Sequence, residues 1–123
     1  MKQFKSLILP IILATAFFAC MPSSFDEKLL PGQWQGAQWI VEGQTDQIDA
    51  TTALFSFGPD GKYTYTYNDA TEKGTYFMSN NELFTTPDGG IKMMVKVQKL
   101  TQDSLVFNMN RGGQSETLTL IRK

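Results

Sequence analysis

The chain has 123 residues, with 11 basic and 12 acidic side chains, one cysteine and no histidine. This length fits one domain, and a net charge of −1 without a basic cluster excludes the electrostatic footprint of a nucleic-acid-binding protein. The absence of histidine excludes serine–histidine and cysteine–histidine nucleophile pairs and the commonest catalytic zinc sites. We therefore expect no catalytic residues, no metal site, no cofactor and no nucleic-acid partner.

Residues 1–19 have the layout of a secretory signal peptide. Lys2 and Lys5 precede an apolar stretch over 6–18, and Ala19 supplies the small residue before Cys20. A helix over this stretch rises about 20 Å, which is short of a hydrocarbon core about 30 Å thick. The alternatives are a retained transmembrane anchor, which the short span disfavours, and an ordinary signal peptide with an incidental cysteine.

Cys20 supports a second interpretation of this segment, as a lipoprotein signal peptide. Residues 15–20 resemble a bacterial lipobox, in which the cysteine is acylated and the chain is cut just before it. The resemblance implies that Cys20 carries fatty chains such as palmitate and anchors the mature protein to a membrane. No aspartate follows Cys20 directly, so resemblance to enterobacterial sorting rules favours the outer membrane of the cell envelope, on either face. Residues 20–31 would then form a tether, with one helical turn over 25–30.

From residue 32 to residue 123 we expect a single all-β domain. Apolar and polar side chains alternate with the period of a strand, and turn signals interrupt them at short intervals. Turns containing proline, aspartate and glycine are expected at 58–61 and 87–90, and tight hairpins at 79–81 and 111–113. Only Glu42–Ala50 is long enough to be a loop. The expected strands are 33–41, 51–58, 61–68, 73–79, 82–86, 90–100, 104–110 and 114–122.

Each expected strand has one apolar and one polar face, which is the pattern of a sheet covered on one side. Because no amphipathic helix is long enough to cover the apolar face, the sheet must cover itself. We therefore expect an antiparallel up-and-down meander of eight strands, which either folds into a sandwich or closes into a barrel. Trp34 and Trp39 fall on opposite faces of the first strand, and a β-bulge near Gly36 would place both inside. The expected inward residues include Ala53, Phe55, Phe57, Tyr63, Tyr65, Tyr67, Ile91, Met93, Val95, Val97, Leu105, Phe107, Met109, Leu118 and Leu120.

Several short motifs carry a resemblance to a known family. Phe25-Asp26 followed by Gly32-Gln33-Trp34 resembles the first lipocalin signature. This resemblance implies that Trp34 plugs the closed end of the barrel and that Arg122 packs over its indole, a cation–π contact. The signature residues are then Gly32, Trp34 and Arg122. More broadly, the chain resembles the lipocalin-like domains of small Bacteroides-type lipoproteins over residues 25–122, through the motifs Phe57-Gly58-Pro59-Asp60-Gly61, Gly74-Thr75-Tyr76 and Leu118–Ile121. This resemblance implies that the sheet closes into an eight-stranded antiparallel up-and-down barrel.

The inward side chains leave open whether the barrel has a cavity. Eight strands enclose a space that side chains can just fill, or that holds one small ligand. Large rings favour a filled core, whereas a row of tyrosines, whose phenols need hydrogen-bond partners, favours an open mouth. Methionines can repack around varied guests. If a ligand binds, the expected lining residues are Phe55, Phe57, Tyr65, Tyr76, Met93 and Phe107.

Three functional hypotheses follow. The first is a binding module that holds a small hydrophobic or amphipathic molecule inside the barrel. The second is a non-catalytic accessory or inhibitor lipoprotein with a filled barrel, which contacts an envelope protein through an exposed Trp39 and the loop Glu42–Ala50. The third and weakest is catalysis by paired carboxylates. The acidic residues that we interpret instead as turn formers are Asp46, Asp49, Asp60, Asp69, Glu72, Asp88 and Asp103.

Overall fold

The computed structural model describes residues 25–44 and 48–123, so the signal segment and Cys20 lie outside the described residues. Two 3-10 turns, η1 (Glu27–Leu29) and η2 (Ala50–Thr52), flank the first strand. The helical turn expected over 25–30 is thereby confirmed as η1. The strands are β1 (Gly32–Val41), β2 (Leu54–Phe57), β3 (Lys62–Tyr67), β4 (Ala70–Ser79), β5 (Glu82–Pro87), β6 (Met93–Leu100), β7 (Ser104–Arg111) and β8 (Gln114–Arg122).

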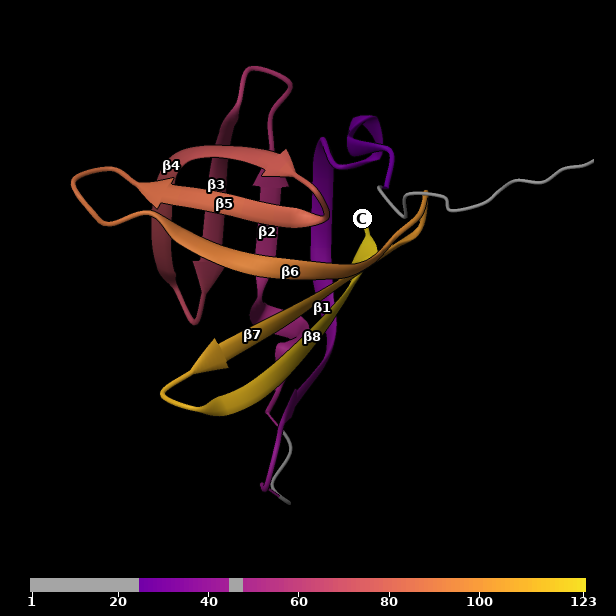
Figure 1. Cartoon of the computed structure of the whole chain (residues 1–123), viewed down its shortest axis with the longest axis vertical. Coiled ribbons are helices and arrows are strands. Elements are labelled where there is room, and N and C mark those ends of the chain that lie inside the picture. The colour runs from indigo at the N-terminus through magenta and orange to yellow at the C-terminus, as the bar shows by residue number, and fades with distance from the viewer. Residues whose placement is uncertain (1–24, 45–47) are drawn as a thin grey trace, which may run out of the picture.

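The strands form one closed barrel in sequence order (Figure 1). Each strand pairs antiparallel with the next, and β1 pairs with β8 to close the ring. The expected eight-stranded antiparallel up-and-down barrel is therefore confirmed. Within the described residues there is no helix of the length and apolarity needed to cross a bilayer.

Three strands begin more than one residue away from their expected starts. β2 begins at Leu54, because Asp49 caps η2 by accepting hydrogen bonds from the backbone and hydroxyl of Thr51. β4 begins at Ala70 and extends the hairpin from β3. Ile91 was expected on the inward face of a strand. This expectation is wrong, because β6 begins only at Met93, and Ile91 is 85% exposed.

Two tight hairpins have non-glycine residues with positive φ: the one expected at 79–81, and a second between β3 and β4 that was not expected. Asn68 and Asp69 join β3 to β4 with φ angles of 49° and 68°. Asn80 and Asn81 join β4 to β5 with φ angles of 52° and 64°. Two consecutive residues with positive φ make a type I′ turn, whose twist matches that of the flanking strands, and asparagine and aspartate tolerate it better than other non-glycine residues.

One end of the barrel is closed by the segment that precedes β1. Trp34 is fully buried, and its indole Nε1 donates to the carbonyl of Leu30 at 2.9 Å. The Arg122 guanidinium lies 4.2 Å from the centre of the Trp34 ring, as the resemblance implied. It also donates to the carbonyls of Leu29, Pro31 and Gln102 at 2.5, 3.1 and 2.6 Å. A Cβ at Gly32 would collide with Arg122 Nη1, so the small residue of the signature makes room for this cap.

A β-bulge in β1 lets both of its tryptophans face inward. The register between β1 and β8 shifts between Gly36 and Gln38. Trp34 and Trp39 therefore both lie on the inner face, which confirms the expected bulge near Gly36. The expectation of an exposed Trp39 is wrong, because the same bulge turns this indole inward and leaves it 9% exposed.

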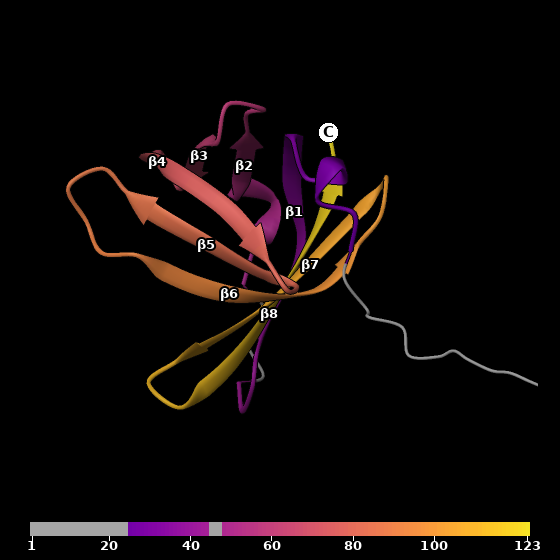
Figure 2. The same ribbon diagram turned by 45° about the horizontal axis from the view of Figure 1, so that its top comes forward.

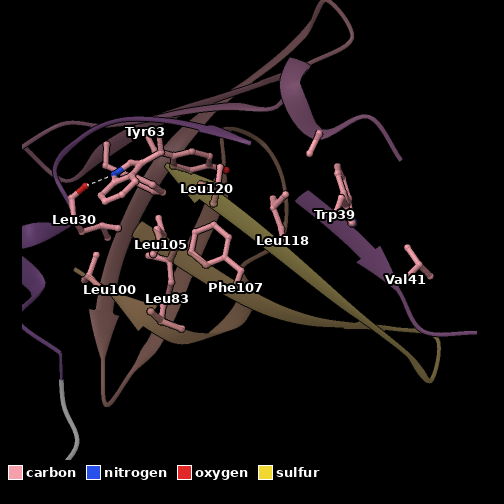
Figure 3. Close-up of a cluster of buried hydrophobic side chains, with 14 residues drawn as sticks. Leu30, Trp39, Val41, Tyr63, Leu83, Leu100, Leu105, Phe107, Leu118 and Leu120 are labelled. Atoms are coloured by element: carbon pink, nitrogen blue, oxygen red, sulfur yellow. Dashed lines mark hydrogen bonds between the residues drawn. The ribbon is translucent and has the colours of Figure 1, made fainter. Parts of the chain in front are cut away.

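The packed core begins at the closed end of the barrel and extends along it to Trp39 and Val41, which lie far from Leu30 (Figure 3). Its side chains are large and aliphatic or aromatic, and they come from strands all around the ring. The fully buried ones are Leu30, Trp34, Phe57, Leu83, Leu105, Phe107, Leu118 and Leu120. Strand registers place the opposite, less filled end where β3 ends, β4 begins and the β7–β8 hairpin turns.

Candidate functional site

The barrel wall has a gap in its hydrogen-bonded ladder between β6 and β7. The two strands pair only between Lys96–Leu100 and Leu105–Asn108. Beyond that region Met93–Val95 pair with β5, and Met109–Arg111 pair with β8. β6 and β7 diverge toward this end in both views (Figures 1 and 2). We call the opening between Met93–Val95 and Met109–Arg111 the β6–β7 slot.

A cavity of about 380 Å³ lies behind the slot and reaches into the barrel. Its size falls in the range of small-molecule sites, which is roughly 300–1,000 Å³. Met93 at the rim is 51% exposed and the Arg111 side chain is 62% exposed, so the cavity opens to solvent there. The lining is mostly aromatic, aliphatic and methionine side chains: Trp39, Phe55, Tyr63, Tyr65, Leu83, Met93, Met94, Val95, Phe107, Met109 and Leu118, with Glu72, Thr85, Asn110 and Arg111 as the polar members.

Ring contacts hold the inner wall of the cavity in place. Phe55 stacks on Tyr65 with ring centres 4.4 Å apart and planes inclined by 17°. Phe107 meets Phe55 edge-on at 5.5 Å. The rings of Trp39 and Tyr67 lie 5.3 Å apart nearer the mouth. Offset-stacked and edge-to-face pairs are the favourable arrangements for aromatic rings, so this wall is preorganised rather than collapsed into the cavity.

The polar groups of the cavity differ in how fully they are paired. The Tyr63 hydroxyl donates to Glu72 Oε2 at 2.5 Å. Burial and this hydrogen bond raise the pKa of Tyr63 well above its usual value near 10. Burial also raises the pKa of Tyr65, while the positive charge of Arg111 opposes that rise. Glu72 is not a turn former as expected, because β4 starts early enough to place it on a strand facing the cavity.

Comparisons with known proteins agree with this architecture. Residues 30–107 match the sequence profile of a lipocalin-like domain. The chain belongs to the lipocalin-like domain family. Members of this family generally have a non-catalytic binding fold.

Two solved structures show the same lipocalin-like fold. An uncharacterized protein from Bacteroides eggerthii DSM 20697 is 15% identical, with a TM-score of 0.58 over 76% of this chain and 98% of its own. A lipocalin-like protein from Bacteroides uniformis ATCC 8492 is 22% identical, with a TM-score of 0.57 over 77% of this chain and 98% of its own. No curated protein matches the sequence. At these identities the likeness shows the fold.

The lipocalin-like barrel brings four of the six predicted lining residues to the cavity. Phe55, Tyr65, Met93 and Phe107 all contribute to its wall. Their role in binding a ligand stays a prediction.

The other two predicted lining residues lie at the closed end. Phe57 is 2% exposed, with the ring of Tyr76 edge-on against it at 4.9 Å. The Tyr76 hydroxyl donates to the Gly58 carbonyl at 2.5 Å, so its polar end is already satisfied by the turn between β2 and β3. Neither residue borders the cavity.

Glu116 is a buried carboxylate that the sequence-based interpretation missed. It is 8% exposed and accepts a hydrogen bond from Trp39 Nε1 at 2.9 Å. Arg111 Nε lies 3.7 Å from its other carboxylate oxygen. Its signal in the sequence is its alternation with Leu118 and Leu120, which predicts an inward-facing acid. Glu116 thus fixes the Trp39 ring of the cavity wall and holds Arg111 loosely at the slot.

The described part of this lipocalin-like chain offers no metal centre. Across residues 25–44 and 48–123, no three acidic, histidine or cysteine side chains gather closely enough to hold a metal ion. Glu72 and Glu116 instead accept hydrogen bonds from Tyr63 and Trp39. The site is therefore an apolar cavity with polar side chains at its rim.

Proposed function

We propose that the protein binds a small hydrophobic or amphipathic molecule in the cavity behind the β6–β7 slot. The observation that supports this most is a solvent-connected space of about 380 Å³ with a preorganised aromatic inner wall. Burial of ligand surface against this wall contributes roughly 25 cal/mol per Å². Met93, Met94 and Met109 border the cavity, and their flexible thioether side chains can adapt to guests of different shape.

A cavity-filling variant tests this proposal. Val95 borders the cavity, and Val95→Trp would place a large ring in the space that the ligand needs. We expect the wild-type protein to bind a hydrophobic fluorophore that is displaced by alkyl compounds, and Val95→Trp to lose this binding. Titration followed by fluorescence and by native mass spectrometry measures both.

Ile40→Trp is the matched control, because Ile40 is 51% exposed on the outside of β1. This variant should bind the probes as the wild type does, and circular dichroism should show both variants folded. The proposal is wrong if no probe binds the wild-type barrel. It is equally wrong if folded Val95→Trp binds as tightly as the control.

We propose further that Cys20 is the lipid attachment site and holds the barrel at the cell envelope, on the outer membrane. This rests on the lipobox-like residues 15–20, which precede the described domain. Metabolic labelling with a palmitate analogue should mark the wild-type protein and leave Cys20→Ala unmarked. Equal labelling of both would contradict lipidation at this residue.

The accessory or inhibitor function, acting on an envelope protein, stays a prediction. The surface first assigned to it included Trp39, which is buried and hydrogen-bonded to Glu116. The cavity also departs from the filled barrel on which that hypothesis was based. Ligand binding is therefore the function that the geometry supports best.

A further inference from the structure

Two side chains of the cavity, those of Arg111 and Tyr65, can donate further hydrogen bonds. Arg111, the last residue of β7, has five N–H donors, and its one ion pair among residues 25–44 and 48–123 is the 3.7 Å approach of Nε to Glu116. The side chain of Arg111 is 62% exposed at the slot. The half-buried Tyr65 hydroxyl makes no hydrogen bond within the described residues, unlike the hydroxyls of Tyr63 and Tyr76.

The acidic groups nearby are already engaged. Glu72 accepts a short hydrogen bond from Tyr63, and Glu116 accepts one from Trp39. Burial raises the pKa of the Tyr65 phenol, and the guanidinium of Arg111, which also borders the cavity, opposes that rise. This part of the cavity therefore offers donors and positive charge to a guest that carries an acceptor.

The charge of the rim also limits how negative the guest can be. One guanidinium faces the cavity mouth, with Glu72 on the wall and Glu116 behind Trp39. These carboxylates would repel a dianionic phosphate more strongly than a monoanionic carboxylate, and a carboxylate matches the single guanidinium in charge and in planar shape. Beyond the rim, the apolar lining formed by Phe55, Val95 and Phe107 suits an alkyl or aromatic tail.

We infer that the ligand is an amphiphile with a carboxylate head, which Arg111 and Tyr65 hold at the rim while its tail lies against Phe55 and Phe107. This inference rests on the proposed function and names the ligand class of the same cavity. The head would accept hydrogen bonds from the guanidinium and the phenol, and would remain next to solvent at the β6–β7 slot. The tail would enter through the part of the wall where β6 and β7 are unpaired.

Three probes with one shared alkyl chain test the head group. Dodecanoic acid, dodecan-1-ol and dodecylamine are titrated by calorimetry into the full domain at neutral pH. We expect the acid to bind about 5-fold or more tightly than the alcohol, because charge-assisted hydrogen bonds exceed neutral ones even at an exposed guanidinium. The amine should bind most weakly, and added salt should reduce the preference for the acid.

Matched variants assign the preference to its residues. Arg111→Gln should bring the acid to the level of the alcohol and leave the alcohol unchanged, while Arg111→Lys should retain part of the preference. Tyr65→Phe, which deletes only the hydroxyl, should weaken the acid more than the alcohol. Lys96→Gln is the control, because Lys96 is an exposed cation on β6 outside the cavity lining.

The outcomes separate this inference from the proposed function. If the alcohol binds as tightly as the acid, or if Arg111→Gln leaves the acid unaffected, the carboxylate inference is overturned and ligand binding stands. Tighter binding of the amine would also overturn the carboxylate inference, and would indicate that Glu72 is the group that contacts the head of the ligand. If none of the probes binds, the cavity function itself fails. The wild-type comparison needs no variant, so a folding defect in one variant leaves the test intact.

Discussion

At the scale of single residues, the buried polar groups are distinguished by the partners they find. Trp39 reaches Glu116, Tyr63 reaches Glu72 and Tyr76 reaches a turn carbonyl, so each of these groups is satisfied inside the barrel. A buried polar group without a partner is costly, which is why such groups are almost always paired. Tyr65 departs from this pattern within the described residues, and it borders the cavity that opens at the β6–β7 slot.

The pairing of Tyr63 predicts a change of stability with pH. The pKa of Tyr63 is raised in the folded barrel, chiefly by burial and then by its bond to Glu72, so the folded state holds this proton more tightly than the unfolded chain does. The resulting stabilisation is fully present below the unfolded pKa near 10 and is lost as the pH rises above it. The loss amounts to at most about 1.4 kcal/mol per pH unit for one tyrosine.

Urea unfolding at a series of alkaline pH values measures this effect. The free energy of unfolding of the wild type should fall steeply above pH about 10, and that of Tyr63→Phe should fall less steeply. Tyrosinate absorbance in the folded protein should show Tyr63 among the last tyrosines to ionise. Parallel pH dependences for the two proteins would rule out Tyr63 as a source of the loss.

At the scale of strands, close backbone approaches explain one of the short motifs. Gly74 lies in β4 between Tyr63 on β3 and Pro87 on β5. A Cβ at Gly74 would collide with the carbonyl oxygen of Thr86. Because this oxygen belongs to the backbone, it cannot move away without a shift of the strand. The glycine of the Gly74-Thr75-Tyr76 motif therefore sets the spacing between β4 and β5, while Tyr76 caps the neighbouring turn.

Gly74→Ala should for this reason destabilise the barrel by about 1–3 kcal/mol, as overpacking does in other cores. Gly90→Ala is the control, since the nearest atom to a Cβ there is a side-chain carbon of Pro87 at 3.1 Å, in an exposed loop. Chemical denaturation should give a clearly larger loss for Gly74→Ala than for Gly90→Ala. Similar losses would show that the β4–β5 spacing relaxes without cost.

At the scale of the whole molecule, the barrel is divided between a packed end and an open end. The Trp34–Arg122 cap and the aliphatic core fill the closed end, which provides stability without a disulfide. The opposite end holds the cavity, the methionine-rich rim and the gap between β6 and β7. This arrangement suits a binding protein. The packed end keeps the fold stable, and a bound ligand then alters side-chain positions only at the less packed end.

The sequence predicted the framework better than the site. Alternation identified Phe55, Tyr65 and Phe107 as inward, and all three line the cavity. It could not separate these from Phe57 and Tyr76, which are equally inward but lie at the closed end. Depth along the barrel axis depends on the stagger between strands, and periodicity carries no information about stagger.

For this chain, the resemblance to lipocalins pointed to the closed barrel and to the packing of Arg122 on Trp34. Alternation and turn chemistry were sufficient to predict eight antiparallel strands and the bulge in β1. These features depend on local backbone preferences and on which face of a strand is apolar, and both can be predicted from the local sequence. Only the tertiary structure decided that Trp39 is buried on Glu116, that Ile91 is exposed, and that β6 and β7 part to open a cavity beside Arg111. Each of those depends on contacts between residues far apart in sequence, and such contacts exist only once the ring has closed.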